Sequence, residues 1–112
     1  MSAPRDDTVY LAHLKDAISR IVSYLDGVSE AEFFESTLLQ DAVIRQLEII
    51  GEASKHLSST FRAAHSAIPW GDIIGMRSKL AHDYMHVNLQ AVWDTTRVDV
   101  PALKRELFQS TE

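Results

Sequence analysis

The sequence predicts an all-α fold, an up-and-down bundle of four to five helices that forms a single domain over residues 1–112. Apolar residues recur at spacings of three and four along most of the chain, which is the helical period. Capping signals stand at the ends of these periodic segments, and the connections between them are short, as in antiparallel bundles. A chain of 112 residues is long enough to bury one core.

The first predicted helix presents one apolar face, formed by Leu11, Leu14, Ile18, Ile21, Val22 and Leu25. Gly27 is predicted to end it in the left-handed conformation that helix C-termini favour. Ser29 and Glu32 have the spacing of a capping box, which predicts a short helical turn carrying Phe33 and Phe34.

The second long helix is predicted from Thr37, whose spacing from Gln40 repeats the capping signal, to about Leu57. Its buried stripe is predicted to be Leu39, Val43, Leu47, Ile50 and Ser54. Gly51 lies inside this helix, where glycine costs on the order of 1 kcal/mol relative to alanine. Close packing against another backbone is the expected compensation.

The remaining elements are predicted from their start and stop residues. The sequence SSTF opens a short helix that ends near His65, and Pro69 suits the first turn of a helix that runs through Leu80. Asn88 can cap a last helix, which Pro101 should kink or restart.

Composition excludes several classes of protein. With 46% hydrophobic and 24% charged residues, the chain has the composition of a globular domain. The absence of cysteine excludes disulfides, thiolate zinc sites and cysteine nucleophiles. The apolar runs are too short to cross a membrane, and the N-terminus lacks the apolar region of a signal peptide, so we expect a cytoplasmic protein.

The charge is spread unevenly along the chain. The net charge is -5, which argues against a surface coated in basic residues for nucleic acid. Residues 51–86, however, carry four Lys or Arg against three acids, together with four histidines. An anion site is therefore expected in the centre of the sequence.

The stretch GMRSKLAHDY, residues 75–84, contains three residues that packing does not require: Arg77, His82 and Tyr84. If one straight helix carried all three, Arg77 and Tyr84 would project almost the same way and His82 would lie about 140° round from Arg77. Arg77 and His82 could then meet only if the helix frayed at His82 or if a second copy of the chain approached across a twofold axis.

The sequence IPWGDIIGMRSKLAHDY resembles the Arg-x4-His-x-Tyr signature of HEPN-domain proteins, specifically the HepT-like toxins of toxin-antitoxin pairs. The likeness covers most of the chain. LEIIGEASKHL at 47–57 is similar to the IGEA motif of the family's second helix, and VNLQAVWDT is similar to the start of its last helix.

The resemblance implies a HEPN-like homodimer that acts as a metal-independent endoribonuclease on tRNA or mRNA, without a cofactor. It places Arg77 and His82 at the dimer cleft as catalytic residues. It also implies a partner, an MntA-like nucleotidyltransferase antitoxin that uses ATP to attach AMP to Tyr84. The residue chemistry agrees, because histidine can act as base or acid and the arginine fork suits phosphate oxygens.

Other interpretations of the same residues stay open. Arg77 could be a surface arginine paired with Asp83 or Glu52, and these two acids could equally support or orient a catalytic arginine; Glu52 could also serve the packing around Gly51. Tyr84 could be a packed aromatic.

Two other functions also stay open. His82 and His86 have metal-ligand spacing, although no third ligand is evident nearby, so a metal-binding helical bundle is one alternative. The other is a non-catalytic HEPN-type module that binds a nucleotidyltransferase or nucleotides.

Overall fold

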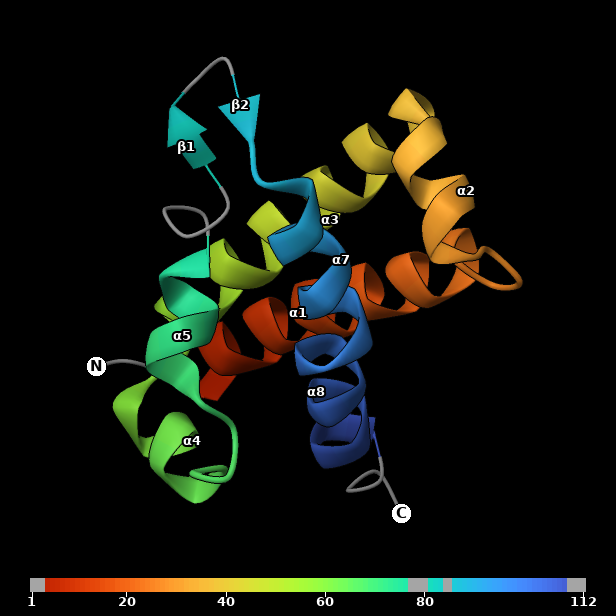
Figure 1. Ribbon diagram of the computed structural model, residues 1–112. Coiled ribbons are helices and arrows are strands. Elements are labelled where there is room, and N and C mark those ends of the chain that lie inside the picture. The colour runs from red at the N-terminus through yellow and green to blue at the C-terminus, as the bar shows by residue number, and fades with distance from the viewer. Residues whose placement is uncertain (1–3, 77–80, 84–85, 109–112) are drawn as a thin grey trace.

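Two long helices, α1 (Pro4–Tyr24) and α3 (Thr37–His56), form the centre of the structure and pack against each other more extensively than any other pair. The computed structural model describes residues 4–76, 81–83 and 86–108. Figure 1 shows the shorter elements around the two long helices. These are α2 (Glu30–Glu35), α4 (Ser59–Ala64), α5 (Trp70–Ile74), β1 (Ala81–Asp83), β2 (His86–Val87), α7 (Leu89–Arg97) and α8 (Asp99–Phe108).

The core is one cluster of apolar side chains that extends from Leu14 of α1 to Leu107 of α8. The predicted stripe of α3 is confirmed at Val43, Leu47 and Ile50, which are fully buried. Within the described ranges, no helix is long and apolar enough to span a membrane.

Two predicted caps near the start of the chain are confirmed. Gly27 has a φ of 74°, the left-handed conformation that a side chain would strain. The Ser29 hydroxyl accepts a hydrogen bond from the Glu32 amide at 3.1 Å, and the Ser29 amide donates to the Glu32 carboxylate at 2.8 Å. Both arms of the capping box therefore begin α2.

The predicted start of α3 at Thr37 is confirmed, but the predicted cap is wrong by one residue. Ser36, and not Thr37, is the N-cap, because its hydroxyl accepts from the Leu39 amide at 3.1 Å. Gln40 does not complete a box; its side-chain amide donates to the carbonyl of Phe33, and to that of Phe34, at 3.1 Å in both cases. Gln40 thus satisfies carbonyls at the end of α2 and holds the corner between two helices.

The all-α class is confirmed in its main part, and two details differ, the strands and the number of helices. A short antiparallel pair of strands, β1 and β2, interrupts the helices. The predicted restart of the last helix near Pro101 is confirmed, because α7 ends at Arg97 and α8 begins at Asp99, with Pro101 in the first turn where proline is tolerated. The part of the chain that the structure describes therefore holds more helices than the predicted four to five.

One carboxylate joins the start of α1 to the start of α4. Asp7 accepts two hydrogen bonds from Ser58, one from its amide at 2.8 Å and one from its hydroxyl at 2.7 Å. The same hydroxyl accepts from the Phe61 amide at 3.0 Å and caps α4. Asp7 therefore orients the residue that begins α4, 51 positions along the chain.

Asp7→Ala should lower the free energy of unfolding by about 1–3 kcal/mol, because two part-buried donors of Ser58 lose a charged acceptor. Urea denaturation followed by circular dichroism measures this change. Asp16→Ala is the matched control on the same helix. The Asp16 carboxylate pairs with Arg20 at 2.8 Å, but both side chains are mostly exposed. The urea concentration at the midpoint of unfolding should therefore barely change in Asp16→Ala. Equal midpoints for the two variants would contradict the role of Asp7.

Candidate active site

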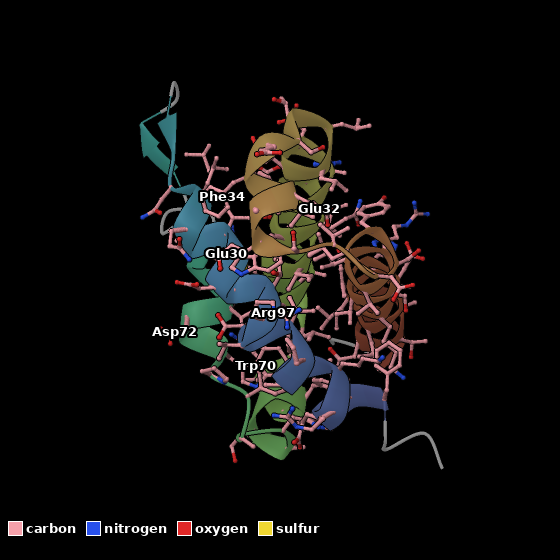
Figure 2. All side chains as sticks on the ribbon, turned by 45° about the vertical axis from the view of Figure 1, so that its right-hand side comes forward. Glu30, Glu32, Phe34, Trp70, Asp72 and Arg97 are labelled. Atoms are coloured by element: carbon pink, nitrogen blue, oxygen red, sulfur yellow. The ribbon has the colours of Figure 1, made fainter. Side chains whose placement is uncertain are left out.

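The chain enters the candidate motif through α5, which is fixed at its first residue. The indole N–H of Trp70 donates to the carbonyl of Arg62 and to that of His65, at 3.1 Å in both cases. These bonds tie the start of α5 to the end of α4. In Figure 2, Trp70 lies toward the interior of the bundle, whereas Asp72 of the same helix lies at its outer edge.

The far end of α5 is seated on α3 at Gly51. A Cβ at this position would lie 3.3 Å from the backbone oxygen of Ile73, so the predicted close approach of a second backbone is confirmed. The approach lets Ile73 and Met76 enter the core with at most 1% of their surface exposed. Met76 directly precedes Arg77 in the sequence, so the chain is anchored where the motif begins.

The chain is anchored again just after the motif. Asn88 caps α7 as predicted, since its side-chain oxygen accepts from the Ala91 amide at 3.0 Å. Val92 and Trp93 in the next turn are buried, and the Trp93 ring lies 5.3 Å from that of Phe33. The motif therefore lies between two segments held by the core.

The predicted helix through Leu80 is interrupted at Gly75, Met76 is helical again, and residues 77–80 lie outside the described residues. Gly75 caps α5 at Ile74, and residues 81–83 form β1, in which Ala81 pairs with Val87 and Asp83 with His86. Helical periodicity does not report the pairing with β2, an interaction between separate segments, that makes residues 81–83 a strand. The expected angle of about 140° between Arg77 and His82 therefore does not apply.

The structure places the candidate residues unequally. His82 and Asp83 lie in β1, for which the backbone path is described. Arg77 and Tyr84 lie outside the described residues. Glu52 lies in the next-to-last turn of α3, directly after the glycine on which α5 is seated.

Glu52 belongs to a polar surface that α3 shares with α1. Its carboxylate lies 3.0 Å from Nε2 of His56, one helical turn later. The His56 ring is stacked on Tyr10 of α1, with ring centroids 4.8 Å apart and an interplanar angle of 18°. Since 59% of its side-chain surface is exposed, Glu52 is available to a polar partner and does not fill the space around Gly51.

This surface is hollowed, which the sequence did not predict. The hollow has a volume of about 320 Å³ and is lined by Tyr10, His13, Arg45, Glu48, Ile49, Glu52 and Ala53. Of these residues, Glu52 and Ala53 belong to the IGEA motif. The helical spacing of Arg45, Glu48 and Glu52 marks a polar face of α3, but only folding brings α1 beside it.

The metal alternative receives no support from the described side chains. Among them, no group of three His, Asp or Glu residues is arranged to hold a metal ion. The pair on which this alternative rested, His82 and His86, has its side chains outside that description.

Known proteins are similar to this chain over most of its length. A family model described as "Ribonuclease HepT-like" matches residues 14–109. A protein from Caldanaerobacter subterraneus subsp. tengcongensis named "Putative RNase TTE0752" is 38% identical over 107 residues, which cover 96% of this chain and 93% of that protein. "Probable ribonuclease HepT" from Thermococcus cleftensis is 40% identical over 95 residues, 85% of this chain and 86% of the relative.

A longer relative carries a second named activity. "Gamma-glutamylcyclotransferase and putative RNase MJ0434" from Methanocaldococcus jannaschii is 41% identical over 108 residues, or 96% of this chain. The match spans about half of that protein, 49% of its length. No solved structure matches the chain.

Proposed function

Because the chain belongs to the HepT-like ribonuclease family, we propose that it is a metal-independent endoribonuclease, the toxin of a toxin-antitoxin pair. The observation that carries the proposal is the family match over residues 14–109, which includes the whole Arg77-x4-His82-x-Tyr84 motif. Relatives that share 38% and 40% identity with the chain are named as ribonucleases. The anchoring of the chain on both sides of the motif is consistent with a preorganised site.

The proposed reaction is transfer within the RNA strand. The 2′-hydroxyl loses its proton and attacks the adjacent phosphorus, the bond from phosphorus to the 5′-oxygen breaks, and the leaving oxygen takes up a proton. The products are a 2′,3′-cyclic phosphate and a free 5′-hydroxyl. His82 serves in proton transfer, and Arg77 stabilises the charge that develops on the phosphate oxygens. Glu52 and Asp83 are proposed to support or orient Arg77.

The proposal includes a homodimer. One chain offers a single motif histidine, whereas the reaction needs one group to remove a proton and another to donate one. A twofold interface supplies every residue twice and so provides both groups in one cleft. Because residues 81–83 form a strand, the angle between Arg77 and His82 on a helix no longer argues for a dimer. The need for two proton-transfer groups does.

The proposal also includes a switch at Tyr84. Its hydroxyl oxygen attacks the α-phosphorus of ATP in the active site of a nucleotidyltransferase antitoxin, the hydroxyl proton is lost to a base of that enzyme, and pyrophosphate leaves. The tyrosine then carries AMP through a phosphodiester. The added negative charge would compete with RNA for Arg77, and the nucleotide would fill the cleft.

A non-catalytic module that binds a nucleotidyltransferase or nucleotides is the second candidate. The hollow between α1 and α3 favours it, since a site of this size suits a small ligand without any cleavage. The two functions are separated by whether RNA is cut in the presence of excess chelator.

His82→Ala and Arg77→Ala should each abolish cleavage of RNA in excess chelator. For Arg77 the loss should be roughly 10²–10³ in rate if it acts like other oxyanion donors. Gel analysis of cleaved tRNA and mRNA measures the rate, and circular dichroism confirms that each variant is folded. Arg20→Ala, an exposed arginine on α1, is the control and should cleave normally. Full activity in either motif variant would leave the binding module as the better explanation.

The purified protein should sediment as a dimer at micromolar concentration, and its activity should depend on that state. Mixing the wild type with an excess of His82→Ala chains tests this dependence, because a mixed cleft then contains one histidine where the reaction needs two. Cleavage by a fixed amount of wild type is expected to fall as its chains enter mixed dimers. A monomer that cleaves RNA would contradict the proposed site.

Co-expression with the proposed nucleotidyltransferase antitoxin should add the mass of AMP to the wild type and none to Tyr84→Phe. The phenylalanine variant keeps the ring but has no acceptor oxygen, so it should remain an active nuclease that modification does not silence. Intact-mass spectrometry and growth assays measure the two effects. An unmodified wild type, or AMP mapped to another residue, would exclude the switch.

A further inference from the structure

The hollow between α1 and α3 has the dimensions of a small-molecule site. Its volume of about 320 Å³ lies at the lower end of the range of roughly 300–1,000 Å³ that ligand pockets occupy. Its walls come from the two longest helices, which pack extensively on each other. A site on such elements keeps its shape when a ligand binds.

One wall of the hollow is aromatic and held in place. One face of the Tyr10 ring is covered by His56, and His56 is itself bound to Glu52 at 3.0 Å. His13 meets the Tyr10 ring edge to face, with centroids 6.2 Å apart. Both Tyr10 and His13 border the hollow. Fixed aromatic rings of this kind are the surfaces on which proteins stack the bases of single-stranded RNA.

Helix α3 contributes hydrogen-bond acceptors to the hollow. Glu48 and Glu52 both line the hollow and lie one turn apart on α3. Ionised carboxylates only accept hydrogen bonds. Guanine presents two adjacent donors, N1–H and the 2-amino group, which match the two oxygens of one carboxylate. Uracil presents a single N–H between two carbonyl oxygens, which a carboxylate repels.

A basic side chain stands beside these acceptors. Arg45 lines the hollow, its guanidinium lies 3.8 Å from the Glu48 carboxylate, and 69% of its side chain is exposed. The guanidinium can therefore reach a backbone phosphate outside while Glu48 faces the base.

The hollow and the motif are linked along the chain through α3 and α5. In the sequence, Gly51, on which the end of α5 is seated, lies between Glu48 and Glu52, and α5 leads into Arg77.

We propose that the hollow is a nucleobase subsite for single-stranded RNA, in which guanine stacks on Tyr10 and is read by Glu48, with the adjacent phosphate on Arg45. This inference rests on the proposed ribonuclease function and extends it to base preference.

Cleavage sites mapped on a random single-stranded RNA test the proposal with the full chain. The wild type should cut where guanine occupies one fixed position relative to the broken bond. Two oligonucleotides that differ only in guanine or uracil at that position then give a ratio of kcat/KM. Tyr10→Ala and Glu48→Gln should each lower this ratio by roughly tenfold or more, given what stacking and paired hydrogen bonds contribute.

Tyr24→Ala is the matched control, because Tyr24 is a half-buried tyrosine on the same helix that does not line the hollow. Its ratio should equal that of the wild type. If Tyr10→Ala and Glu48→Gln also keep the wild-type ratio, the subsite is excluded although the ribonuclease is real. If Tyr10→Ala instead turns a dimer into a monomer with the guanine preference intact, the hollow is a protein interface and the proposal fails.

A binding experiment separates this inference from the proposed function. If the wild type cuts no RNA, guanosine 5′-monophosphate and uridine 5′-monophosphate are titrated into it and followed by NMR. Binding of the guanosine nucleotide alone, weakened roughly tenfold or more in Tyr10→Ala, supports the subsite in a protein that is not a nuclease. Equal binding, or no binding, overturns it.

Discussion

The close approach of α3 and α5 at Gly51 is the constraint on which the candidate site depends. Any side chain at this position would press on the backbone oxygen of Ile73, at 3.3 Å for the first carbon alone. Because glycine leaves this space open, Ile73 and Met76 reach the core and the chain is anchored just before Arg77. The cost of glycine inside a helix is offset by the packing that it permits.

The core holds the segments before and after the motif, through Met76 on one side and Val92 on the other, while β1 and β2 are joined to each other through their own pairing. Figure 1 shows this pair of strands projecting from the helices. Functional residues are often found on such connecting segments, which a rigid scaffold positions.

Sequence patterns predicted helix caps correctly where the capping interaction lies within one short segment. Gly27, the box of Ser29 with Glu32, and the Asn88 cap were all predicted, because each interaction spans at most three residues. The cap of α3 was missed by one residue, because Ser36 and Thr37 are both good caps and the choice between them involves Gln40. That side chain reaches back to carbonyls at the end of the preceding helix, a contact that capping rules do not include.

The sequence by itself determined the helical class, the buried stripe of α3 and the family, since periodicity and motif order are local or linear properties. Tertiary structure decided that His82 lies in a strand, because pairing between β1 and β2 is an interaction between segments that no helical period reports. It also decided the hollow: Tyr10 and Glu48 stand far apart in the chain and meet only because α1 packs along α3.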